Sequence, residues 1–275
     1  MLRLSPDRLL IGLAPDSLSL VRVSGAPSPR VSEKRTIACD PALGNEPWRG
    51  VCATLTRFAG EVANVSARVT VVLSNHFTRY VLVPWSEGLR KTEEETAFAR
   101  YCFAKIHGER SKDWDLRLSP AHSRSARIAS AVDAPMVQAI KTAFPSKARL
   151  ASIQPYLMSA FNRWRNQLAG ARTWLLLIEP QRACLARLER GQWVAVRNSR
   201  GSFEGPEQWV SLLDRELHLA GGDRALEDVY VHAPNGWKSP STKTEGWTFK
   251  NLAFAPAQGL TPSEAERFGM ALSAL

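Results

Sequence analysis

The fold is decided by one stretch near the start of the chain, Leu9-Leu-Ile-Gly-Leu-Ala-Pro-Asp-Ser-Leu-Ser-Leu-Val-Arg-Val23. It contains two apolar runs, and side chains in the second run alternate between apolar and polar as they do in a strand. Between the runs, Ala14-Pro-Asp16 supplies the residues that turns favour. The stretch therefore predicts a β-hairpin with a short turn.

The residues after this hairpin extend it into a larger unit. Alternation predicts a third strand over Arg30–Cys39, and apolar spacings of three and four predict a helix over Trp48–Val62. A short apolar run over Arg68–Leu73 predicts a buried strand. The predicted order of this unit is β-β-β-α-β.

A smaller block follows, with the predicted order β-α-β-β-α. Its expected elements are a strand over Tyr80–Trp85, a helix from a capping box at Thr92–Glu95 to Gly108, strands over Trp114–Leu118 and Arg127–Val132, and a helix over Pro135–Ala143. The first helix is expected to bury one face through Phe98, Tyr101, Cys102 and Ile106.

The order of the first unit then recurs. After a helix predicted over Pro155–Leu168, strands are expected at Trp174–Ile178, Ala183–Leu188 and Trp193–Arg197, a helix at Gln208–Leu219 and a strand at Val229–His232. Thr261-Pro-Ser-Glu264 predicts a capping box for a last helix to Leu275. The chain is therefore expected to be an α/β protein with two β-β-β-α-β halves.

This duplicated plan resembles the actin-like, ribonuclease H-like superfamily, and within it the bacterial type IV pilus-assembly ATPase family (PilM-like). The chain is also similar to the cytoplasmic region of the type II secretion L protein and to the division protein FtsA. The resemblance is carried by residues 11–23, by Leu177-Ile-Glu-Pro-Gln-Arg182 and Leu188–Arg197, and by Glu266–Leu272, which is similar to the terminal helix of the family.

The resemblance implies a division of the chain into three units. The first half would comprise residues 1–77 and 146–168, the inserted small α+β subdomain residues 78–145, and the second half residues 169–275. The subdomain that the superfamily inserts late in the second half is expected to be missing, because too few residues follow Val229.

The superfamily binds nucleotide phosphates with two strand-turn-strand loops of the form Asp-x-Gly-Ser/Thr. By the resemblance, Ala14 and Asp16 stand at the aspartate and glycine of the first loop, and Glu179 and Gln181 stand there in the second. Each loop thus loses its glycine and gains a proline, which has no amide hydrogen to offer a phosphate. The adenosine-side glycine pair is replaced by Ala233-Pro-Asn-Gly236, and Gly221-Gly222 is interpreted as a turn that ends a helix. The chain is therefore expected to be a degenerate, non-enzymatic member without a nucleotide cofactor.

Composition excludes several other classes. The 275 residues are 44% hydrophobic and 23% charged, as in globular proteins, and no apolar run is long enough to span a membrane. The first residues reach charge and proline too early for a signal peptide. Neither the four scattered cysteines nor the five histidines have metal-ligand spacing, so no metal site is expected, and unpaired cysteines suit a reducing compartment.

The resemblance implies a scaffold in a type IV pilus or type II secretion assembly platform. In the family, the cytoplasmic member binds an N-terminal peptide of a bitopic inner-membrane protein, in a groove between the first half and the inserted subdomain. The groove residues expected here are Tyr80, Val83, Trp85, Phe98 and Tyr101. The alternative is that these five side chains form only the core of the subdomain.

The net charge of +10 suits a cytoplasmic protein held peripherally at the anionic inner membrane, although a basic surface can also simply be soluble. Self-association is left open. One alternative is an ATP-binding enzyme of the same superfamily with unorthodox loops. Another is a nucleic-acid-binding protein, suggested by basic residues around aromatics at Arg163-Trp-Arg165, Arg187–Arg200 and Lys238–Lys250. It is disfavoured because Trp164 fits an apolar helix stripe and Arg187, Arg190, Arg197 and Arg200 fit the outer face of a strand pair.

Overall fold

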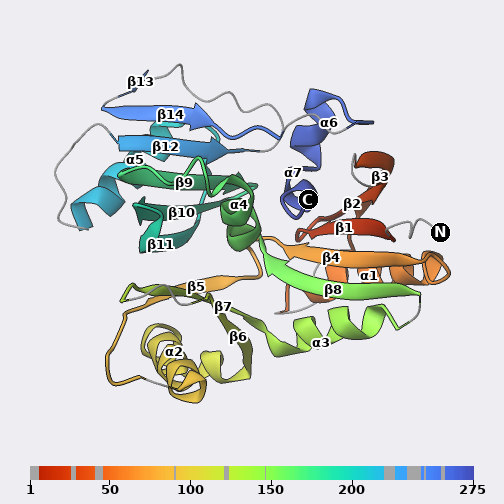
Figure 1. Cartoon of the computed structure of the whole chain (residues 1–275), viewed down its shortest axis with the longest axis horizontal. Helices are drawn as coiled ribbons and strands as arrows, with labels where there is room; N and C mark the ends of the chain where they lie inside the picture. Colours follow the sequence, from red (N-terminus) through yellow and green to blue (C-terminus); the bar gives the residue numbers. More distant parts are fainter. Residues whose placement is uncertain are drawn as a thin grey trace.

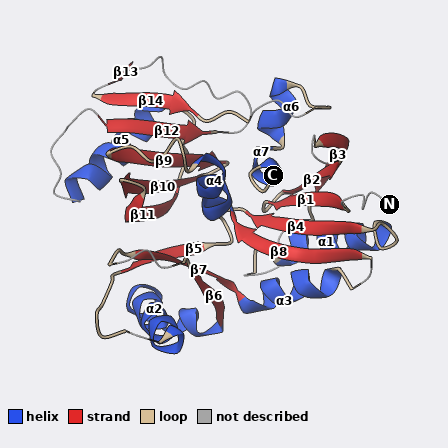
Figure 2. Ribbon diagram, in the orientation of Figure 1, coloured by secondary structure: helices blue, strands red, loops and turns tan. Residues whose placement is uncertain are grey.

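The computed structural model describes residues 6–25, 29–40, 46–89, 91–120, 124–145, 147–219, 227–233, 243–244, 246–254 and 258–275. Three β-sheets organise them. Figure 1 places a six-stranded sheet at the upper left, a five-stranded sheet at the right and a three-stranded sheet at the lower left. Figure 2 shows the helices packed on the faces of these sheets. None of the described helices has the length and apolarity needed to cross a bilayer.

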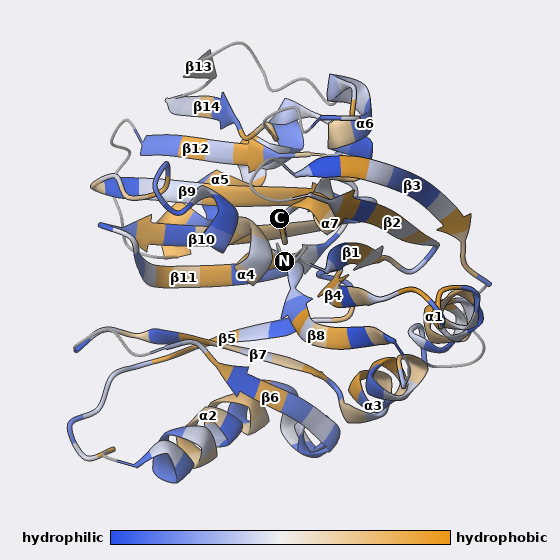
Figure 3. Cartoon of the chain, turned by 45° about the vertical axis from the view of Figure 1, so that its right-hand side comes forward, coloured by the Kyte–Doolittle hydropathy of each residue, from blue (hydrophilic) through white to orange (hydrophobic). Residues whose placement is uncertain are grey.

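The five-stranded sheet has the order β3-β2-β1-β4-β8. Its strands are β1 (Asp7–Leu13), β2 (Ser17–Ser24), β3 (Arg30–Ala38), β4 (Ala67–Leu73) and β8 (Ala148–Pro155), and α1 (Arg49–Glu61) and α3 (Ala134–Ala143) cover one face. β1 is antiparallel to β2 and parallel to β4. The edge strand β3 is largely hydrophilic (Figure 3). We call this sheet and its helices the first half.

The six-stranded sheet repeats that arrangement, with the order β11-β10-β9-β12-β14-β13. Its elements are β9 (Arg172–Glu179), β10 (Arg182–Glu189), β11 (Gln192–Arg200), α5 (Pro206–Leu219), β12 (Glu227–His232), β13 (Lys243–Thr244) and β14 (Trp247–Asn251). The strands β11-β10-β9-β12 match β3-β2-β1-β4 in order and direction. The predicted duplication is therefore confirmed, and this sheet with α5 is the second half.

The two halves share a hydrophobic core. Leu10 on β1 and Leu175 on β9 turn toward it, and α4 (Tyr156–Trp164) lies between the sheets with α6 (Pro262–Arg267) and α7 (Gly269–Leu272). The neighbouring side chains Leu9 and Ile11 face α1 and α3 instead, as the alternation of a strand requires. α4 contributes Leu157 and Trp164, so it joins both halves. The sequence-predicted domain boundaries remain a prediction.

The three-stranded sheet belongs to the inserted block. It has the order β5-β7-β6, from β5 (Arg79–Val83), β6 (Trp114–Leu118) and β7 (Arg127–Asp133), and α2 (Thr92–His107) with the short 3-10 helix η1 (Gly108–Asp113) covers one face. The predicted order β-α-β-β-α is confirmed. We call this block the small subdomain.

The prediction for the buried face of α2 was right in part, because Phe98 and Cys102 pack against the core of the small sheet. Ala99 and Phe103 pack inward, whereas Tyr101 and Ile106 are more than 60% exposed. Ala99 was not predicted to be buried, because the prediction favoured larger apolar residues. The helix begins after Lys91, whose amide donates to the Glu94 carboxylate at 3.2 Å, rather than after Thr92.

Several other predictions need correction. The strands β8, β13 and β14 were missed, and the last helix is interrupted at Phe268, although its predicted capping box between Thr261 and Glu264 is present. Arg187 is not on an outer face: it is buried, 3.4 Å from the Glu227 carboxylate. The predictions for 221–222, for 234–236 and for most of the loop 238–246 fall outside the described residues.

Candidate functional site

The first candidate site is a cavity of about 470 Å³ between the two halves, which we call the cleft. The β1–β2 turn and the β9–β10 turn face it, and α6 and α7 close a third side. All four predicted loop positions, Ala14, Asp16, Glu179 and Gln181, line it. The structure thus brings together the two turns that the sequence placed 165 residues apart, counted from Ala14 to Glu179 (179 − 14).

The first turn is closed by its own backbone. The Ala14 amide donates to the Ser17 carbonyl at 2.9 Å, and the Ser17 amide donates back at 3.4 Å. Pro15 has no amide hydrogen. The Asp16 side chain is exposed and accepts the Ser17 hydroxyl at 2.9 Å. This turn therefore presents the Asp16 carboxylate to the cleft, and its Ala14 and Ser17 amides are already paired.

The second turn keeps the backbone shape of a glycine-containing loop without the glycine. Glu179 and Arg182 are paired across it, so Pro180 and Gln181 form a two-residue connection. Gln181 has φ = 55°, in the left-handed region that glycine enters most easily. Position 181 is therefore occupied by glutamine, although its backbone has a left-handed conformation.

Glu179 is the most constrained group of the cleft. Its carboxylate is 4% exposed and accepts hydrogen bonds from the Ser74 hydroxyl and, at 3.1 Å, from the Asn75 amide. Ser74 and Asn75 follow β4 of the first half, whereas Glu179 ends β9 of the second. The carboxylate therefore bonds one half to the other.

Further hydrogen bonds join the same segments. The Asn198 side-chain amide on β11 donates to the carbonyls of Asn75 at 2.7 Å and of Thr78 at 2.8 Å. The Tyr80 hydroxyl donates to the Asn75 side-chain oxygen at 2.8 Å. Sequence reasoning did not identify Ser74, Asn75 or Asn198, because each becomes important only through a partner more than 100 residues away.

Two titratable side chains in the lining of the cleft are fully buried, and burial shifts the pKa of each. Burial lowers the pKa of His232 to about 4, so its ring is neutral at pH 7. Burial also raises the pKa of Tyr156 well above its ordinary value. The described lining carries the carboxylates of Asp16, Glu179 and Glu266 but one arginine, Arg267.

No metal centre is formed by the described residues, among which no three potential metal-ligating side chains come together. In the cleft, Glu179 is already engaged by two donors and Asp16 lies on the opposite turn.

The five predicted groove residues do not form one surface. Tyr80 turns toward the core between the halves, whereas Val83, the next-but-two residue on β5, packs under α2. Trp85 is 48% exposed beside a small cavity of about 120 Å³ that Val83 also lines. Phe98 and Tyr101 stack on α2 with ring centroids 6.2 Å apart. Their role in partner binding remains a prediction.

Two cavities do lie between the first half and the small subdomain. The first, which we call the groove, is about 480 Å³ and separates β8 from the face of the small sheet that α2 leaves uncovered. It is lined by Leu73, Asp115, Arg117, Ser130, Val132, Val137, Lys141, Leu150, Ala151, Ser152, Ile153 and Pro155. The sequence analysis missed it because it did not identify β8 as a strand.

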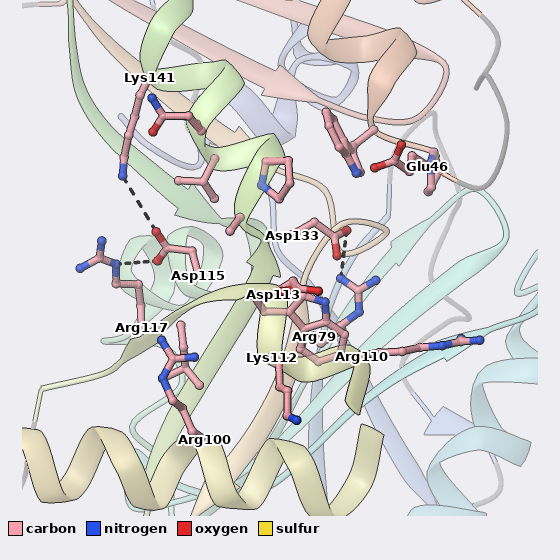
Figure 4. A pocket seen from close by; sticks show the side chains of 18 residues that line it. Glu46, Arg79, Arg100, Arg110, Lys112, Asp113, Asp115, Arg117, Asp133 and Lys141 are labelled. Carbon is pink, nitrogen blue, oxygen red and sulfur yellow. Dashed lines mark hydrogen bonds and ion pairs between the residues drawn. The ribbon is translucent and has the colours of Figure 1, made fainter. Parts of the chain in front are cut away.

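The second, which we call the basic cavity, is about 1560 Å³ and adjoins the groove through Asp115, Arg117, Val137 and Lys141. Figure 4 shows its basic side chains, which come from β5, α2, η1, β6 and α3; Arg110 and Lys112 point away from the paired acids. Asp115 pairs with both Arg117 at 3.2 Å and Lys141 at 3.9 Å. Arg79 lies over the Trp114 ring, 4.4 Å from its centroid.

The sequence matches no family model and no curated protein. Solved structures are similar, however. The PilM–PilN type IV pilus biogenesis complex contains a chain 17% identical, with a TM-score of 0.68 and 97% of each chain covered. The cytoplasmic domain of EpsL, an inner-membrane component of the Vibrio cholerae type II secretion system, is 12% identical, with a TM-score of 0.58 and coverage of 97% of this chain and 95% of that one.

A third similar structure is a Bacteroides thetaiotaomicron protein of unknown function with an actin-like ATPase fold. It is 13% identical, with a TM-score of 0.58, and the match covers 84% of this chain and 83% of the other. These likenesses agree with the duplicated sheets and with the two turns that face one cleft. The chain therefore has the actin-like ATPase fold.

Proposed function

We propose that this protein is a non-enzymatic, actin-like scaffold of a type IV pilus or type II secretion assembly platform. Its function would be to bind a cytoplasmic peptide of a bitopic inner-membrane protein. The observation that carries this proposal is the groove between β8 and the small subdomain, which combines an apolar floor with a sheet edge. Similarity to PilM in its complex with PilN supports it.

The cleft supports the non-enzymatic part of the proposal. Phosphate loops work by pointing backbone amides at phosphate oxygens. Here Pro15 and Pro180 lack amide hydrogens, the Ala14 and Ser17 amides are paired, and Glu179 is bonded to the other half. In the proposed scaffold, the hydrogen bonds that Ser74 and Asn75 donate to Glu179 would hold the two halves together without a nucleotide.

A peripheral position at the inner membrane is part of the proposal. Each basic side chain near an anionic leaflet contributes about 1 kcal/mol of attraction. The chain has 36 basic and 26 acidic residues, which gives a net charge of +10. Stronger co-sedimentation with anionic vesicles than with neutral vesicles would support this attraction, and equal co-sedimentation with both would contradict it.

A groove-filling variant tests the proposal. Ala151 is exposed and lines the groove, so Ala151→Trp blocks the groove without entering the core. Ser32→Trp places the same side chain on β3, the opposite edge strand of the same sheet, as a matched control. The probe is a labelled synthetic peptide that covers the cytoplasmic N-terminal segment of a single-span protein encoded beside this chain.

Fluorescence anisotropy should show saturable binding to the wild type and to Ser32→Trp with similar Kd values. Ala151→Trp should weaken binding at least about tenfold, which is 1.4 kcal/mol. Equal binding by Ala151→Trp, or absence of binding by every such peptide, would contradict the proposed function.

A further inference from the structure

The strand β8 occupies an unusual position, because it ends the first sheet inside the groove. It pairs with β4 on one side, from Ala148 opposite Ala67 to Pro155 opposite Leu73, and no described strand pairs with its other side. A strand at the edge of a sheet has unpaired backbone amides and carbonyls along its free side. An extended chain that enters the groove therefore meets main-chain donors and acceptors as well as apolar side chains.

We propose that the partner segment binds by β-strand addition, as a sixth strand of the first sheet beside β8. This inference rests on the proposed function and specifies how the peptide is recognised. Main-chain hydrogen bonds would supply register and affinity, and alternate side chains would supply specificity. The lined part of β8 runs from Leu150 to Pro155, and its register with β4 is irregular at Ala151, which leaves a regular edge from Ser152 to Pro155 for a short added strand.

The groove defines one end of the added strand. Pro155 has no amide hydrogen, so pairing stops there. Directly beyond it, β8 ends and the chain enters α4. The segment would therefore be short, and residues beyond it would leave the sheet.

The walls of the groove predict an alternating sequence for the segment. Val132 and Val137 are both buried in the core of the first half and also border the groove, so they present an apolar surface to one face of an added strand. Ser130 and Ser152 border it as polar residues. Because successive side chains of a strand point to opposite faces, every second residue of the segment would be apolar.

The charge of the basic cavity predicts which residues flank the apolar part of the bound segment. The basic cavity continues from the groove and is lined by six basic and four acidic side chains (Figure 4). Two of its acids, Asp115 and Asp133, are already paired with basic side chains, whereas Arg100 and Arg110 form no ion pair with a described residue. Asp113 lies among these side chains and reduces the surplus. We expect the end of the segment that reaches this cavity to carry carboxylates.

A second copy of this chain fits the groove less well. The free side of β8 faces the small sheet across the groove, so a second folded sheet that paired with β8 would have to occupy the space between them. A peptide segment without its own fold can enter. We therefore assign the edge to a partner peptide rather than to self-association.

The backbone is tested with N-methylated peptides on the full chain. The probe is the synthetic N-terminal peptide described above, with one amide methylated at a time. In an added strand, alternate amides point toward β8, so methylation at every second position should weaken binding at least about tenfold, and methylation between them should have little effect. Hydrogen exchange should show slower exchange of the amides of β8 when the peptide is bound.

The charge is tested by Arg100→Glu combined with Arg110→Glu. The matched control is Arg163→Glu with Arg165→Glu, two exposed arginines at the end of α4 that line neither the groove nor the basic cavity. The first pair should weaken binding several-fold, and the difference should shrink at about 1 M salt, where the screening length is about 3 Å. The control pair should bind as the wild type does.

The outcomes separate this inference from the proposed function. If the peptide binds and Ala151→Trp blocks it, but methylation has no alternating effect and β8 gains no protection, strand addition is overturned and the scaffold proposal stands. If Arg100→Glu with Arg110→Glu binds the peptide with unchanged affinity, the prediction that the segment carries carboxylates at that end is overturned. A dimer that Ala151→Trp dissociates would assign the edge to a second copy and overturn the inference.

Discussion

The two turns that face the cleft occupy equivalent places in the duplicated halves, yet they are built differently. In the second turn, Glu179 is buried and bonded to the first half, and Gln181 keeps a left-handed backbone. In the first turn, Asp16 is exposed and its charge is met by the neighbouring Ser17 alone. One turn has become part of the core between the halves, whereas the other has remained a surface turn.

The contrast indicates when a carboxylate in a turn stabilises this fold. Glu179 is buried, and two donors from the other half satisfy its charge, the Ser74 hydroxyl and the Asn75 amide. Among the described residues, Asp16 accepts a hydrogen bond from Ser17 beside it and from no group of the other half. The residues of the first turn are therefore expected to tolerate change.

The largest expected effect comes from removing the two carboxylates in turn. Glu179→Ala leaves the Asn75 amide buried without its acceptor and should lower the free energy of unfolding by about 2–3 kcal/mol. Asp16→Ala alters an exposed side chain and should change it by less than about 0.5 kcal/mol. Chemical denaturation of both variants measures the contrast, and equal effects would break the comparison between the turns.

The next largest expected effect is a dependence of stability on pH, which we assign to His232 in the second half. The folded pKa of His232, about 4, lies below the ordinary value of 6.5, so the unfolded chain binds a proton more readily between these values. Its contribution to stability is complete above about pH 6.5 and is lost as the pH falls toward 4. Between pH 7 and pH 5 the loss should be about 2 kcal/mol.

Urea denaturation at both pH values checks this, with His232→Gln as the comparison, since glutamine does not titrate. The drop in stability of the wild type should exceed that of the variant by about 2 kcal/mol. If both proteins lose the same stability, His232 is not the group responsible.

The smallest expected effect concerns the backbone conformation at positions 181 and 16 of the two turns. Gln181→Gly relieves a left-handed backbone but makes the unfolded chain more flexible, so stability should change by less than about 1 kcal/mol in either direction. Gln181→Val should be the less stable variant, because a β-branched side chain disfavours φ = 55°. At position 16, φ is not positive, so a valine there should carry no cost from a left-handed backbone. Thermal unfolding of the glycine and valine variants at both positions measures this difference in stability.

Much of this architecture could be predicted from the sequence because the deciding patterns are local. The apolar runs at Leu9–Leu13 and Trp174–Ile178 are long and flanked by turn residues, and both are central strands. β8 was missed because Ser152, Gln154 and Pro155 interrupt its apolar pattern at a half-exposed edge. β14 was missed because it follows a polar, proline-containing stretch.

The residues of the candidate sites could likewise be predicted only where a local pattern marks them. The four loop positions could be located because each sits in a short turn between two clear strands. The bonds from Ser74 and Asn198 could not, because they join residues more than 100 positions apart in the chain. The groove could not be predicted either, since it depends on β8 and on which face of the small sheet α2 leaves open.

The account's central claim is that the chain's own side chains hold the cleft closed and that no nucleotide does so. Titration of the full chain with magnesium and ATP, followed by its unfolding transition, tests this claim most directly. We predict that the transition does not move at any ATP concentration. A saturable rise in stability, which would reach about 2.7 kcal/mol at one hundred times the Kd, would contradict the account.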